Sequence, residues 1–204
     1  MKIGDIKIEA LKLMFANYSF DFGINDLPNM QGDENYGSYL VSMNGSINRG
    51  IDRIQNACVV ALKSYTIKNS EFTKGQPFDR FNSSAIKDLY VIDRIVAVDS
   101  LGNYNGNADY LLEGNNILLE SGSTYTILYY PTLKTVDDTI GDADEIWLPA
   151  HIARLLPYFI KGELYQEEEP SLAADARNIF EMSLDDLKKP AQGNQTRIKQ
   201  ILHF

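Results

Sequence analysis

Residues 156–189, LPYFIKGELYQEEEPSLAADARNIFEMSLDDLKK, contain two helical patterns separated by an acidic turn. Apolar residues recur every three or four positions on both sides of this turn, which is the spacing of one face of an α-helix. The first pattern begins upstream, and the two sets are Leu148, Ile152, Leu155, Leu156 and Phe159, then Leu172, Ala176, Ile179, Phe180, Leu184 and Leu187. Pro149 suits a first helical turn, Pro157 should bend the first helix, and Pro170 marks the restart. The stretch therefore predicts an antiparallel helical hairpin.

The hairpin is rich in acidic residues, with eight carboxylates in these 34 positions and three in a row at Glu167, Glu168 and Glu169. Such a run indicates either a metal or catalytic site or a solvated turn. Carboxylates near the start of a helix are stabilised by its dipole and free N–H groups, at about 0.3–1 kcal/mol each. The two histidines, His151 and His203, have no ligand spacing. We therefore interpret the run as the solvated tip of the hairpin.

The rest of the chain predicts an α+β fold. A short helix fits the apolar spacing from Ile6 to Phe15, with Asp5 as its cap, and a long helix fits the spacing from Leu40 through Cys58 to Tyr65. Residues 68–135 alternate short β-branched or aromatic runs with Gly and Asn turns, including an Asn105–Gly106 pair. We expect a helical bundle of about four helices with an inserted antiparallel β meander or small sandwich, and an extended C-terminal arm.

In this prediction residues 1–189 form one domain, made of helices in 1–67 and 147–189 and a β-rich insert in 68–135. Residues 190–204 form the arm, because Pro190 and Gly193 end the preceding helix. The arm is predicted to bind a partner subunit or protein, and its candidate contact residues are Arg197, Ile198, Lys199, Ile201, Leu202 and Phe204. The alternative is that its apolar side chains fold back on their own domain.

Other candidate site residues favour structural roles. The cluster of acids from Asp137 to Glu145 lacks the alternating spacing of a calcium loop, so a surface loop is the favoured interpretation. His151 has neither a nucleophile motif nor an orienting acid, and Cys58 falls on the apolar stripe of the long helix, as a core residue would. The strand from Tyr125 to Pro131 fits either a binding face or a packed sheet. We expect no catalytic residue, no cofactor and no metal.

Composition and charge narrow the class of partner. The single cysteine excludes an internal disulfide framework, and the sequence has neither a signal-peptide pattern nor a long apolar run, so we expect a soluble protein made inside a cell. From Lys188 onward the chain has four basic residues and no acid, which leaves a net charge of −13 on the remainder, against −9 for the whole chain. An acidic body binds nucleic acid poorly, because phosphates are neutralised by basic residues.

The order of elements and two segments resemble the head-to-tail adaptor, or connector, proteins of tailed bacteriophages. The first segment is ADYLLEGNNILLE followed by STYTILYYP, and the second is IWLPAHIARLLPYFIKGELYQEEEPSLAADARNIFEMSLDDLKK. The resemblance covers roughly residues 85–189 and implies a virion protein, made in the host cytoplasm, that forms a ring of about twelve copies around the DNA channel. It implies contacts with the portal and tail proteins, DNA passing through without being gripped, and no membrane. The alternatives are a metal-dependent hydrolase of unknown substrate and a generic soluble protein-interaction domain.

Overall fold

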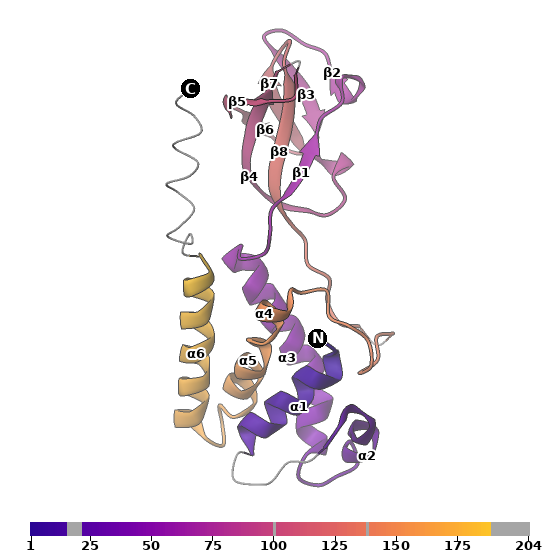
Figure 1. Ribbon diagram of the computed structural model, residues 1–204, viewed down its shortest axis with the longest axis vertical. Coiled ribbons are helices and arrows are strands. Elements are labelled where there is room, and N and C mark those ends of the chain that lie inside the picture. The colour runs from indigo at the N-terminus through magenta and orange to yellow at the C-terminus, as the bar shows by residue number, and fades with distance from the viewer. Residues whose placement is uncertain (16–21, 100, 138, 189–204) are drawn as a thin grey trace. The chain divides into compact units, whose positions relative to one another are not determined.

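The computed structural model describes residues 1–15, 22–99, 101–137 and 139–188, which form a mixed α+β chain with two antiparallel sheets (Figure 1). The chain divides into two compact units, one made of Met1–Val59 with the segment from Leu133 onward, and one made of Val60–Thr132. The first unit contains the long helices and the second contains both sheets. In the part of the chain that the structure describes, no helix is long and apolar enough to cross a membrane.

The helical unit is built from two long helices, one of intermediate length and three short ones. Their bounds are α1 Ile3–Met14, α2 Leu27–Met30, α3 Gly37–Ala57, α4 Ala150–Ala153, α5 Leu156–Leu164 and α6 Pro170–Lys188. Asp5 does cap α1, but from its third position, where its carboxylate accepts the backbone N–H of Lys2 at 3.0 Å. The apolar faces of α1, α3 and α5 meet in a core that includes Ile6, Leu11, Met43, Ile47, Ile51, Ile54, Leu156 and Ile160.

The long helix ends earlier than its apolar spacing predicts. It stops at Ala57, and Cys58 adopts a left-handed conformation (φ 53°) as the C-cap, with its N–H bonded to the Gln55 carbonyl at 3.1 Å. Cys58 is therefore half-buried at a helix end rather than in the helical core. Tyr65 lies instead on β1 (Lys63–Thr66), opposite Ile127 of β8 (Thr124–Pro131). The expectation of helix through Tyr65 was wrong because backbone pairing in the sheet outweighs local apolar spacing.

The predicted hairpin is formed by α5 and α6, which run antiparallel. Gly162 on α5 lies against Ala173 and Arg177 of α6, while Phe159 lies against Phe180 with ring centroids 5.0 Å apart. Proline sets the upstream boundary: Pro149 precedes α4, and the pattern breaks between α4 and α5, where Pro157 occupies an early position. Two features predicted from the sequence are therefore present in this segment: a helical hairpin and a break in its first helical pattern that is bounded by prolines.

Not every residue of the predicted apolar stripe on α6 is buried. Phe180, Ala173, Ala176 and Leu184 face the helical core, whereas Leu172, Ile179 and Leu187 are exposed. The expectation that Ile179 packs in the hairpin core beside Phe180 was wrong, since Ile179 is 45% exposed and Phe180 only 1%. Adjacent positions of an α-helix are about 100° apart around its axis. A neighbouring element that packs on Phe180 therefore leaves Ile179 exposed.

The β unit consists of two four-stranded antiparallel sheets with strand orders β1-β8-β4-β5 and β2-β3-β7-β6. The remaining strands are β2 Phe72–Thr73, β3 Phe78–Asn82, β4 Leu89–Val98, β5 Tyr104–Asn107, β6 Leu111–Glu113 and β7 Asn116–Glu120. Residues from both sheets share one core, which includes Phe72, Phe81, Ile95, Ile117, Leu119, Tyr125, Ile127 and Tyr129. This matches the two-sheet alternative, and it places Tyr125 and Tyr129 in the core rather than on a binding face.

The turns of the β unit match the sequence in one case and differ in another. Gly114 (φ 58°) and Asn115 join β6 to β7, as the Gly-Asn pair predicts. The Asn105–Gly106 pair lies inside β5 instead of forming a turn. The turn before β5 depends on Asp99, whose carboxylate accepts the N–H groups of Leu101 and Asn103, each at 2.8 Å.

Candidate functional site

The three consecutive glutamates lie in the loop between α5 and α6, and all three are exposed. Glu168 accepts a hydrogen bond from the Tyr39 hydroxyl of α3, and the Glu169 carbonyl accepts the Ala173 N–H at 3.0 Å. Burial, followed by the bond to Glu168, raises the pKa of Tyr39 above its ordinary value. The loop therefore leads directly into α6, and Glu168 ties the loop to α3. Among the described residues, no group of three or more His, Cys, Asp or Glu side chains could hold a metal ion.

The acidic segment from Asp137 to Glu145 holds the start of α1. The backbone carbonyls of Asp142 and Asp144 accept the N–H groups of Gly4 (2.8 Å) and Ile3 (3.0 Å), which are free donors at the helix N-terminus. The Asp142 carboxylate also pairs with the buried Lys7 ammonium at 2.6 Å. The segment therefore replaces the N-cap side chain that Lys2 does not provide. Sequence reasoning missed this role because the partners are distant along the chain.

Individual acids of this segment also stabilise its own turns. Asp144 accepts the Gly141 N–H at 2.7 Å, and Asp137 accepts both the hydroxyl and the N–H of Thr139. The hydroxyl bond, followed by the backbone bond, lowers the pKa of Asp137. These carboxylates are therefore used within the loop rather than directed toward one ligand.

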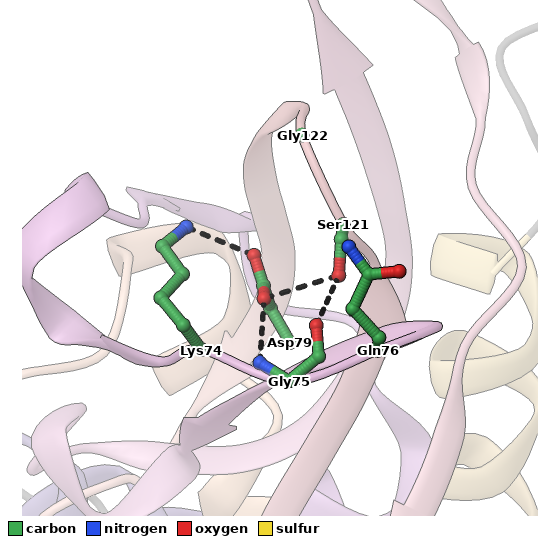
Figure 2. Close-up of a pocket in the computed structure, with 6 residues that line it drawn as sticks. All are labelled: Lys74, Gly75, Gln76, Asp79, Ser121 and Gly122. Atoms are coloured by element: carbon green, nitrogen blue, oxygen red, sulfur yellow. Dashed lines mark hydrogen bonds and ion pairs between the residues drawn. The ribbon is translucent and has the colours of Figure 1, made fainter.

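The β unit contains a polar hollow of about 580 Å³, which no sequence motif indicated (Figure 2). Its lining combines the segment Lys74–Gly75–Gln76, between β2 and β3, with Asp79 on β3 and with Ser121 and Gly122 in the β7–β8 turn. Asp79 is only 3% exposed and lies at the centre of a bonded network. Its carboxylate accepts the Lys74 ammonium (2.9 Å) and the Gly75 N–H (3.1 Å). The Ser121 hydroxyl lies 3.1 Å from the same carboxylate and 2.9 Å from the Gly75 carbonyl.

This network keeps Asp79 ionised. The bond from Lys74 is the largest cause that lowers its pKa, the Gly75 and Ser121 bonds add to it, and burial opposes them. A catalytic carboxylate needs access to substrate, and a serine nucleophile needs a base near neutral pKa. Asp79 is covered and already bonded, and residues 60–132 contain no histidine and no cysteine. The hydrogen bonds that line the hollow therefore join two turns of the β unit.

One exposed apolar surface of the helical unit lies on α6. Leu172, Ile179 and Met182 are 43%, 45% and 68% exposed, and Asp175 lies between them. These four residues, here called the α6 stripe, are spaced by three, four and three positions, so they share one helical face. The stripe is turned about a third of a turn away from the buried face of α6. The α6 stripe is therefore accessible to a partner protein, as are the helix faces through which helices bind in grooves.

A second surface of the helical unit is a groove of about 400 Å³ between α1 and the α4–α5 segment. It is lined by Met1, Leu13, Leu155, Pro157 and Tyr158, together with the exposed charged residues Glu9 and Arg154. Glu9 is paired with Lys12 at 3.0 Å. Arg154 forms no ion pair with any residue in the described ranges. The groove therefore combines an apolar lining with one unpaired cation.

The predicted arm contacts, Arg197, Ile198, Lys199, Ile201, Leu202 and Phe204, lie outside the described residues, as does His203. His151 is an exposed residue of α4. No protein-family model matches the sequence, and neither does any curated protein.

Proposed function

We propose that this protein is a structural assembly subunit, a head-to-tail adaptor of a tailed bacteriophage that forms a ring on the portal and joins it to tail components. The α6 stripe carries the proposal, because three exposed apolar residues on one helical face offer a surface to another protein. In this proposal the helices act as a bundle that supplies ring contacts, and the subunits close into a ring through head-to-tail contacts.

The charge distribution supports the same role. The net charge of −9 disfavours binding to phosphates, so DNA passes an acidic surface without being held. Residues 190–204 are basic and partly apolar in sequence, and in this proposal they act as an arm that binds a neighbouring subunit or the portal. In the acidic segment, the carboxylate of Asp142 pairs with Lys7, and those of Asp137 and Asp144 accept N–H groups of the segment's own turns.

Co-sedimentation with the portal protein of the same genome tests this proposal. Full-length protein should sediment with the portal, and high salt should weaken the association because charge steers it. A variant that ends at Lys188 should keep its melting temperature and lose portal binding. If full-length protein never associates with the portal, the adaptor function is wrong. If the shortened variant binds normally but melts several degrees lower, residues 189–204 belong to the core and not to an arm.

A further inference from the structure

The α6 stripe contains a charge that an apolar contact would have to neutralise. Asp175 is exposed between Leu172 and Ile179, and it forms no ion pair with any residue that the structure describes. A partner that covers this stripe removes water from the carboxylate, which is costly unless the partner supplies a cation. The surface that fits the stripe must therefore be apolar and carry one positive group.

The groove between α1 and the α4–α5 segment has this composition. Leu13, Leu155 and Tyr158 supply apolar surface, and Arg154 supplies a guanidinium that has no ion-pair partner within the described chain. A guanidinium can meet a carboxylate through two parallel hydrogen bonds, which gives both charge and geometric specificity. Both surfaces are thus partly apolar, and their charged residues without an ion pair in the described chain, Asp175 and Arg154, are opposite in sign.

One molecule cannot join its own two surfaces. The buried face of α6, with Phe180 and Leu184, packs on α5, and the stripe lies about a third of a turn away from that face. The stripe is a fixed part of the surface of α6 and the groove lies between α1 and the α4–α5 segment, so the two surfaces of one copy do not meet. Because one chain carries both halves of the pair, a second copy of the chain is a complete partner.

We infer that the α6 stripe of one copy docks in the α1–α5 groove of the next, with Asp175 paired to Arg154 across the contact. The contact is heterologous, since each copy uses one surface as donor and the other as acceptor, and repetition of such a contact builds a closed ring or an open filament. This inference rests on the proposed function, for which it names the contact surface between subunits.

A charge-exchange experiment by sedimentation velocity tests the contact with the full-length chain. Asp175→Arg and Arg154→Asp should each weaken self-association by at least about tenfold, because each places like charges across the contact. An equimolar mixture of the two variants should associate again, because every contact in an alternating assembly then joins opposite charges. The double variant should also associate alone. Asp52→Arg, an equal charge change at an exposed position of α3, is the matched control and should behave as the unmodified chain.

Each contrary outcome has a separate meaning. If the unmodified chain associates and both single variants match it, this contact is wrong while ring assembly through another surface stands. If removing residues 189–204 abolishes association and Asp175→Arg does not, the tail and not α6 occupies the groove, which also overturns the inference. A chain that stays monomeric at every concentration overturns it as well, and portal co-sedimentation then decides the adaptor function independently. Melting temperatures of all variants should equal that of the unmodified chain, since both residues are exposed.

Discussion

Truncating Phe180 to alanine tests the packing of the α5–α6 hairpin most severely. The Phe180 ring is 1% exposed and lies against the Phe159 ring at a centroid distance of 5.0 Å. Loss of a buried phenyl ring removes its transfer free energy and leaves a cavity, which together cost roughly 3–5 kcal/mol in protein cores. The aromatic pair contributes about 0.5–1.5 kcal/mol beyond its buried area, so a value in the upper half of that range is expected.

The adjacent residue provides a matched control. Ile179 precedes Phe180 on the same helix but is 45% exposed on the α6 stripe, so Ile179→Ala should change the free energy of unfolding by less than about 0.5 kcal/mol. Urea unfolding followed by circular dichroism at 222 nm measures both variants. If Phe180→Ala costs under about 1 kcal/mol, or if both variants cost the same, the orientation of α6 is wrong.

Three further substitutions or conditions probe other contacts. Gly162→Ala should destabilise the chain by about 1–3 kcal/mol, because the new Cβ would lie 2.5 Å from Arg177 Cγ. Gly45→Ala, on the exposed face of α3, should instead stabilise the chain by up to about 1 kcal/mol. Similar shifts in melting temperature for the two variants would contradict the close approach of α5 and α6. Asp142→Ala should cost about 3 kcal/mol by leaving Lys7 buried without its partner, and a neutral effect in urea unfolding would show that the Asp142–Lys7 pair does not stabilise the helical unit. Burial and a bond to a carboxylate raise the pKa of Tyr129 to about 12. Its phenol therefore keeps its proton in the folded chain at pH values where the unfolded chain has lost it, so roughly 2–3 kcal/mol of stability should disappear between about pH 10 and 12. Tyr129→Phe should reduce this loss of stability, and an unchanged pH profile in that variant would refute the assignment.

The sequence predicted the elements whose signals are local. Helical spacing identified α1, most of α3 and the α5–α6 hairpin, and prolines marked where the hairpin helices begin. Apolar spacing did not locate the end of α3 or distinguish Ile179 from Phe180, because both outcomes depend on the neighbour that packs there. The helical-bundle arrangement, the single-domain organisation of residues 1–189 and the C-terminal arm stay predictions.

The candidate surfaces were harder to predict than the elements. Asp79 meets Ser121 only when the β2–β3 segment and the β7–β8 turn come together, and Asp142 and Lys7 lie far apart in the sequence. The groove with Arg154 combines α1 with α5, so no sequence window contains it. By contrast, the spacing of Leu172, Asp175, Ile179 and Met182 is visible in the sequence, and only its exposure had to come from the structure.

Electron microscopy of the full-length protein bound to the portal of the same genome tests the central claim, that this chain assembles as a ring-shaped adaptor. The account predicts a closed ring of copies on the portal, in which each copy is joined to the next through α6. It also predicts that the ring is absent when the Asp175→Arg variant replaces the unmodified chain. A portal that carries no added ring, at concentrations of this protein well above those needed for assembly, would contradict the claim that the chain is a ring-shaped adaptor.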